Sequence, residues 1–139
     1  MEVRACYEEM GSNFDEVLSR LGSEQMVQRF AIKFLNDKSY ETLEAALKEK
    51  DVDSAFRAAH TLKGVCVNLG FDKLYEVSSA LTEKLRAKEL DGTDVMFEKV
   101  KEQYDITVNA IRKLLSIFHI LPIQYKNGSM SGEQEEIIK

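Results

Sequence analysis

Three residues in the segment RAAHTLKGVCVNLGF, residues 57–71, could together carry a phosphoryl group. His60 supplies an imidazole, which is substantially neutral and nucleophilic at cellular pH. Lys63 carries a compact positive charge and three hydrogen-bond donors, with which it could bind an anion. Gly64 has no side chain, so a bulky group could approach the imidazole above it. Attack of the imidazole on phosphorus would give a phosphoramidate, from which the phosphoryl group passes readily to another acceptor.

Helical spacing places further residues beside His60. Residues three, four and seven positions apart share one face of an α-helix, which has about 3.6 residues per turn. The neighbours of His60 on that face are Phe56, Arg57, Lys63, Gly64 and Val67. Arg57 adds a second cation, and Phe56 and Val67 are either apolar flanks of the site or half-buried edges of the core. A glycine inside a helix costs about 1 kcal/mol relative to alanine, so position 64 needs its empty space for an approaching group or for close helix packing.

The sequence places no second catalytic group next to His60. Neither a general base nor a metal-binding cluster accompanies this histidine along the chain. Phosphoryl transfer depends mainly on positioning and on neutralising charge. We therefore expect a phosphoryl carrier without ATP-dependent kinase activity and without a metal or cofactor of its own. Its partner would supply Mg²⁺ and the acceptor carboxylate.

The helix that must position His60 is predicted to begin at Asp51 or Asp53, since either aspartate suits an N-cap. Small and apolar residues recur along it at spacings of four and three, which is typical of a bundle helix. These residues are Ala55, Ala59, Leu62, Cys66 and Leu69. His60 lies about 100° away from Ala59 around the helix, so we expect it on a mainly exposed face. Gly70 suits the position that ends the helix.

The rest of the chain has the same helical periodicity and no alternating strand pattern. We expect one short helix over residues 13–22, and longer helices over residues 23–35, 40–47, 72–88 and from 93 or 94 to Pro122. The helix over residues 72–88 would turn Leu74, Val77, Leu81 and Leu85 inward. His119, near the end of the last helix, is expected to be structural.

Short loops between amphipathic helices favour antiparallel neighbours. The predicted fold is therefore all-α, an antiparallel up-and-down four-helix bundle with one or two short extra helices at the N-terminal end. Residues 1–122 would form this domain, and residues 123–139 would form a polar C-terminal tail.

The segment around His60 resembles the histidine-containing phosphotransfer (HPt) family. His60, Lys63, Gly64 and Gly70 match the family pattern H-x-x-K-G-x-x-x-x-x-G, and the resemblance covers roughly residues 15–119. It implies a four-helix bundle in which the histidine is phosphorylated, the lysine assists the phosphoryl group and the first glycine keeps the face open. It also implies two partners, a response-regulator receiver domain and a sensor histidine kinase. Phe56 and Val67 would then form part of an apolar patch on which the receiver docks.

Two features depart from the family. Small residues usually follow the Lys-Gly pair, whereas this chain has Val65, Cys66 and Val67, and Val67 would slightly restrict access to His60. Many members also have a glutamine on the next helix that hydrogen-bonds the active imidazole. Thr82 occupies the matching position here. Its shorter reach would leave His60 more loosely oriented, or would require a bridging water.

Composition excludes several other classes of protein. The net charge is −5, which argues against the basic face that nucleic-acid binding requires. No apolar stretch approaches the ~18 residues of a membrane span, and the N-terminus does not resemble a signal peptide. Cys6 and Cys66 are far apart and form no CxxC pair, so neither a disulfide framework nor a zinc site is expected. We therefore expect a cytoplasmic monomer.

Two further functions fit the same residues. One is the phosphoacceptor domain of a chemotaxis-type histidine kinase, whose similar motif is also followed by Gly-Phe, as at Gly70-Phe71 here. Against this reading, the chain contains no ATP-binding domain, and Met1 with the polar tail suggests a complete small protein. The other is a module that docks receivers without being phosphorylated. A di-metal bundle is excluded, because no glutamate stands three residues before either histidine.

Overall fold

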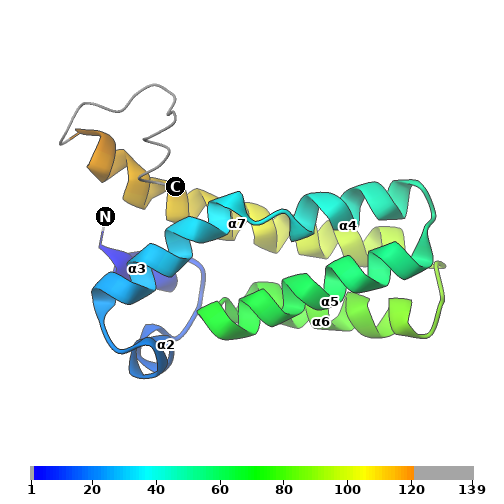
Figure 1. The fold of residues 1–139 in the computed structure, drawn as a ribbon, viewed down its shortest axis with the longest axis horizontal. Coiled ribbons are helices and arrows are strands. Elements are labelled where there is room, and N and C mark those ends of the chain that lie inside the picture. Colours follow the sequence, from blue (N-terminus) through cyan, green and yellow to red (C-terminus); the bar gives the residue numbers. More distant parts are fainter. Residues whose placement is uncertain (1, 121–139) are drawn as a thin grey trace.

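The computed structural model describes the backbone of residues 2–120 and the side chains of residues 2–115, and every regular element in this range is helical (Figure 1). The elements are α1 (Val3–Glu9), α2 (Phe14–Leu21), α3 (Glu24–Lys33), the 3-10 helix η1 (Phe34–Asn36), α4 (Ser39–Lys48), α5 (Val52–Leu69), α6 (Asp72–Arg86) and α7 (Thr93–Ile120). The predicted all-α class is confirmed. The predicted tail, residues 123–139, and the side chain of His119 lie outside the described residues.

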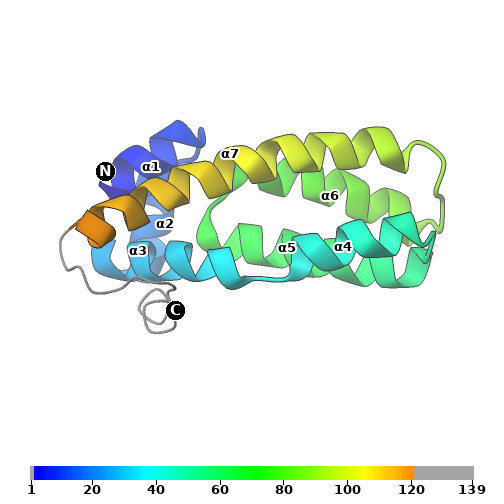
Figure 2. The ribbon, with the colours of Figure 1, turned by 90° about the horizontal axis from the view of Figure 1, so that it is seen from above.

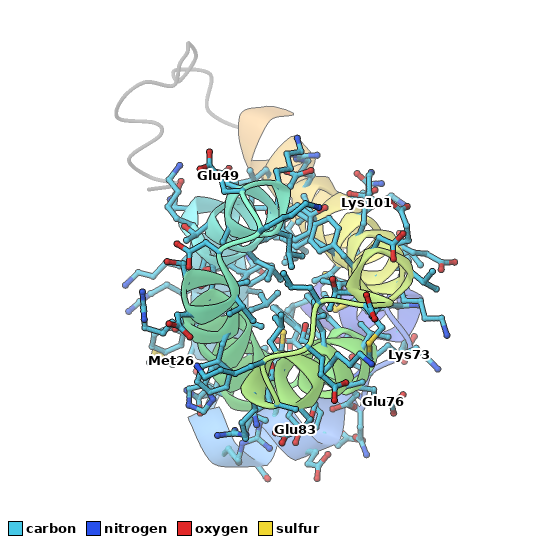
Figure 3. All side chains as sticks on the ribbon, turned by 90° about the vertical axis from the view of Figure 1, so that its right-hand side faces the viewer. Met26, Glu49, Lys73, Glu76, Glu83 and Lys101 are labelled. Carbon is cyan, nitrogen blue, oxygen red and sulfur yellow. The ribbon has the colours of Figure 1, made fainter. Side chains whose placement is uncertain are left out.

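Helices α4, α5, α6 and α7 lie side by side and surround a common interior when viewed along the long axis (Figures 1, 2 and 3). The helix that carries His60, α5, packs against both α4 and α6. The turns between these helices are short, covering residues 49–51, 70–71 and 87–92. The three helices α1, α2 and α3 gather at one end, next to the C-terminal end of α5 (Figure 2).

Side-chain caps determine where the helices begin. Asp51, rather than Asp53, caps α5, because its carboxylate accepts a hydrogen bond from the backbone N–H of Ser54 at 3.1 Å. Hydrogen bonds from Ser54 also lower the pKa of the Asp51 carboxyl group. Ser23 caps α3 in the same way, because its hydroxyl accepts a hydrogen bond from the backbone N–H of Met26 at 3.2 Å.

The inward stripe predicted for α5 is confirmed. Ala55, Ala59, Leu62 and Cys66 are completely buried, and Leu69 is half-buried. Both cysteines of the chain, Cys6 and Cys66, are free and buried. Burial raises the pKa of the Cys66 thiol, so this side chain packs as a small apolar group.

The buried face of α6 differs from the prediction. Leu74, Leu81 and Leu85 are buried as expected, but Val77 is only half-buried, and Ser78 and Thr82 are buried instead. A threonine can be buried in a helix because its hydroxyl can donate to a backbone carbonyl one turn earlier. The Thr82 hydroxyl does so, donating to the carbonyl of Ser78 at 2.7 Å.

The N-terminal helices close the end of α5. Arg20 from α2 donates to the carbonyls of Val67 and Asn68 at 2.9 and 3.3 Å. The Tyr7 hydroxyl of α1 donates to the carbonyl of Leu69. The last carbonyls of a helix have no partner within the helix, so these bonds complete the C-terminal turn of α5.

Replacing Gly70 by alanine is expected to lower the free energy of unfolding by about 2–3 kcal/mol. Gly70 has a φ of +74°, in the left-handed region that side chains disfavour, and an added Cβ would lie 2.9 Å from Cβ of Val17. Gly92→Ala is the matched control, because Gly92 has a φ of +81° but no atom of the described residues within 4 Å of an added Cβ. Its expected cost is about 1 kcal/mol. Urea denaturation measures both, and equal losses would show that the contact with Val17 is harmless.

Candidate functional site

His60 lies on α5 with its side chain exposed, as its angular position predicts. Lys63 and Gly64 follow on the next turn of the same helix. Because α5 is held on both sides by α4 and α6, its outer face presents the three residues in a fixed geometry. A reacting group from outside the bundle can therefore reach the imidazole directly.

Gly64 leaves an open space beside the imidazole. A Cβ added at this position would meet no atom of the described residues within 4 Å, outside its own helix and chain neighbours. Close helix packing, the structural alternative for this glycine, is therefore excluded within the described part of the chain. Gly64 lowers the stability of α5 relative to alanine, and helix packing does not explain why a glycine occupies this position.

An aromatic contact positions the imidazole. The rings of His60 and Phe56 stack with their centroids 5.8 Å apart and an interplanar angle of 24°. The guanidinium carbon of Arg86, on α6, lies 4.9 Å from the centroid of the same Phe56 ring. Phe56 is half-buried. It thus links the phosphoacceptor candidate on α5 to a cation on α6.

A carboxylate on α6 faces the lysine of the motif. Glu83 Oε2 lies 3.9 Å from Lys63 Nζ, and Glu83 accepts hydrogen bonds from Nε and a terminal nitrogen of Arg86 at 3.0 and 3.3 Å. The hydrogen bonds from Arg86 lower the pKa of Glu83, with smaller contributions from the charges of Lys63 and His60. Figure 3 shows Glu83 on the outer side of the bundle.

Thr82 is not brought to the imidazole. It is completely buried, and its hydroxyl donates to the carbonyl of Ser78 on its own helix. The prediction that Thr82 is a site residue, which would orient His60 only loosely or through a bridging water, therefore needs correction. The physical reason is rotation of α6, since one residue along a helix changes the direction of a side chain by about 100°. Glu83, the next residue, takes the exposed direction.

Of the remaining predicted site residues, Val67 and Arg57 are exposed and Gly70 is buried. Val67 is 48% exposed and is free to contact a partner. Arg57 is exposed too, but its guanidinium donates to the hydroxyl of Ser54 at 3.2 Å. Gly70 is buried and ends α5 with a positive φ. Its place in the motif therefore follows from the geometry of the helix end.

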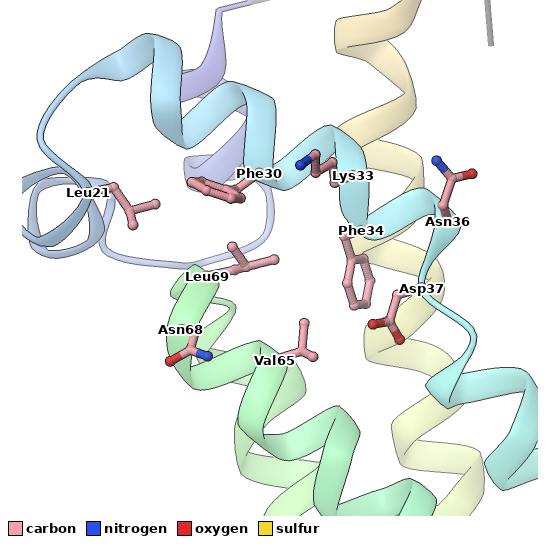
Figure 4. Close-up of a pocket in the computed structure, with 9 residues that line it drawn as sticks. All are labelled: Leu21, Phe30, Lys33, Phe34, Asn36, Asp37, Val65, Asn68 and Leu69. Atoms are coloured by element: carbon pink, nitrogen blue, oxygen red, sulfur yellow. The ribbon is translucent and has the colours of Figure 1, made fainter. Parts of the chain in front are cut away.

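The structure also contains hollows that do not hold the imidazole. The apolar one shown in Figure 4 has a volume of about 560 Å³ and lies between α3, η1 and the C-terminal half of α5. It is lined by Leu21, Phe30, Lys33, Phe34, Asn36, Asp37, Val65, Asn68 and Leu69. A second hollow, of about 370 Å³, lies between α4 and α5 and is lined mainly by residues of polar types, Arg57 and Thr61 among them. Neither of these two hollows is lined by His60, Lys63 or Gly64.

Neither a metal-binding cluster nor a membrane-spanning helix is present among the described residues. No group of three or more His, Cys, Asp or Glu side chains among them could hold a metal ion. None of the helices in the described part of the chain has the length and apolarity that crossing a bilayer demands.

Two residues of the site, Glu83 and Arg86, were not predicted from the sequence. They stand 23 and 26 positions after His60, on another helix. Their three-residue spacing shows that they share a face of α6, but which helix that face meets depends on the rotation of α6 in the bundle. That rotation is set by packing, which spacing along one helix does not reveal.

Comparison with known protein families identifies a family for this chain. The model of the Hpt domain family matches residues 35–115 of the chain. The matched range includes the whole of α5 and α6, with every site residue described above. Comparisons with curated proteins and with solved structures found no match.

Proposed function

Because this chain belongs to the family of Hpt domain proteins, which carry phosphoryl groups on histidine in two-component signalling, we propose that His60 is its phosphoacceptor. The chain would accept a phosphoryl group on His60 and pass it to or from the aspartate of a response-regulator receiver domain. The observation that carries this proposal is the open space at Gly64, next to an exposed histidine and a lysine.

The proposed transfer is a direct exchange of one bond for another. The lone pair of one ring nitrogen of His60 attacks phosphorus of the receiver's aspartyl phosphate. An N–P bond forms, the O–P bond breaks, and the electron pair leaves with the aspartate as a carboxylate. The other ring nitrogen keeps its hydrogen. Lys63 would neutralise the charge of the phosphoryl oxygens during transfer.

The finer features of the relay are part of the same proposal. The upstream donor would be a sensor histidine kinase or a first receiver, and Mg²⁺ would be bound by the receiver. Val67, with the edge of Phe56, would contribute the apolar surface on which the receiver docks. We further propose a cytoplasmic monomer in which residues 1–122 form an antiparallel up-and-down four-helix bundle. The short turns between α4, α5, α6 and α7 support that topology.

The first test is the mass of the intact protein after incubation with phosphoramidate, and separately with a phosphorylated receiver. The expected result is a single added phosphoryl group that is lost in acid and kept in alkali, as a phosphorus–nitrogen bond requires. An intact helical fold with no added mass from either donor would contradict the proposal. A receiver that still binds under those conditions would favour the docking module instead.

A further inference from the structure

The cation expected to assist the phosphoryl group already has an anionic neighbour in the structure. Lys63 Nζ is 3.9 Å from Glu83, and the lysine side chain is only 20% exposed, whereas that of Glu83 is 57% exposed. A phosphoryl group on His60 would therefore interact with a lysine, Lys63, that already forms an ion pair with Glu83. This arrangement bears on how tightly the site holds a phosphoryl group.

We propose that Glu83 is a positioning residue that competes with the phosphoryl group for Lys63 and so lowers the stability of the phosphorylated state. The inference rests on the proposed function and deepens it. Glu83 would make His60 a better donor to the receiver, because a less stable phosphohistidine gives up its phosphoryl group more readily.

The position of the Glu83 carboxylate is fixed by a second contact. Arg86 binds both of its oxygens through two nitrogens, at 3.0 and 3.3 Å. The guanidinium of Arg86 in turn lies over the ring of Phe56, which stacks on His60. The carboxylate is thus held at the site by Arg86, and its Oε2 also lies 3.9 Å from Lys63 Nζ. A two-pronged arginine–carboxylate contact is geometrically specific.

Electrostatics gives the direction of the effect. A phosphoryl group brings negative charge to His60, and Glu83 is close enough for the charge of His60 to contribute to lowering its pKa. Glu83 would repel the new charge and would also hold part of the positive charge of Lys63. Both effects disfavour the phosphorylated form. Since Glu83 is more than half exposed, water and salt screen the interaction, and a change of a few-fold is expected.

The test is the equilibrium of phosphoryl exchange between this protein and a receiver, measured for wild type and Glu83→Gln. The variant removes the charge and keeps the shape of the side chain. The phosphorylated fraction of His60 is expected to shift in favour of this protein by about three- to fivefold, and the shift should shrink as salt is added. Glu76→Gln is the matched control. It removes the same charge from an exposed residue of α6 seven positions away, and should leave the equilibrium unchanged.

A double-mutant cycle separates competition for Lys63 from a general effect on the fold. In a Lys63→Gln background, incubated until the phosphorylated fraction is constant, Glu83→Gln should shift the equilibrium by less than half as much. An equal shift in both backgrounds, or an equal shift with Glu76→Gln, would overturn the inference. If wild type and Glu83→Gln are phosphorylated to the same extent, only this inference fails. If wild type takes up no phosphoryl group, the proposed function itself fails.

Discussion

His60→Gln is expected to abolish phosphoryl uptake from phosphoramidate and from a phosphorylated receiver. Glutamine keeps the polarity of the position but has no ring nitrogen that can form a phosphoramidate. Because His60 is exposed, the substitution should change the free energy of unfolding by no more than about 0.5 kcal/mol. Intact mass measures the loss of uptake, and thermal unfolding followed by circular dichroism measures the retained fold.

The second histidine of the chain provides the control. His119→Gln removes the only other imidazole, and it should leave one acid-labile phosphoryl group per chain. An acid-labile group that persists in His60→Gln and disappears in His119→Gln would transfer the role to the last helix. If the acid-labile phosphoryl group persists in each single variant and is lost only in the double variant, both histidines accept a phosphoryl group.

Gly64→Leu is expected to stabilise the protein and yet to slow transfer from a receiver by at least about a hundredfold. Leucine favours a helix over glycine by roughly 0.8 kcal/mol, and an added Cβ meets no atom of the described residues within 4 Å beyond its chain neighbours and the nearby backbone of its own helix. The same side chain would occupy the approach to His60. A misplacement of about 1 Å between reacting groups can cost a hundredfold in rate. Single-turnover transfer from a phosphorylated receiver measures this rate.

A graded series makes the Gly64 prediction specific. Gly64→Ala should also raise the free energy of unfolding, by about 1 kcal/mol, but should slow receiver transfer much less than leucine. Phosphoramidate is far smaller than a receiver, so the loss with this donor should be smaller in both variants. Unchanged receiver transfer in Gly64→Leu would show that partners do not approach over this face.

The helix that carries His60 was the most predictable part of the molecule. Its buried stripe from Ala55 to Cys66, its exposed histidine and its end at Gly70 all depend on spacing within one helix, and the structure confirms them. The position of the seven-residue helix α1 was not predicted, because two helical turns are too short to be stable without the neighbours against which they pack. It forms because Val3, Cys6, Tyr7 and Met10 are buried together.

The part of the site on α6 was the least predictable. The family resemblance pointed to Thr82, whereas the structure turns Thr82 into the core and Glu83 outward. Thr82 and Glu83 are consecutive residues, so a rotation of α6 by about 100° would turn one into the direction of the other. Burial of Leu81 and Leu85 alone does not decide which of the two faces the core. Thr82 can be buried because its hydroxyl is satisfied by its own helix, which is a property of the folded backbone. The pairing of Glu83 with Lys63 required the relative rotation of two helices.

Arg20 and Tyr7 bond the end of α5 but lie outside the region that the family model matches. The matched region is therefore shorter than the part of the chain that holds α5 in place. The matched region begins at residue 35, yet the last carbonyls of the helix bearing His60 are bonded by residues of α1 and α2. A fragment trimmed to the matched region would leave those carbonyls to water and would remove Val17 from beside Gly70. The region that the family model matches therefore depends on α1 and α2, which lie outside it, to bond the end of the helix that bears His60.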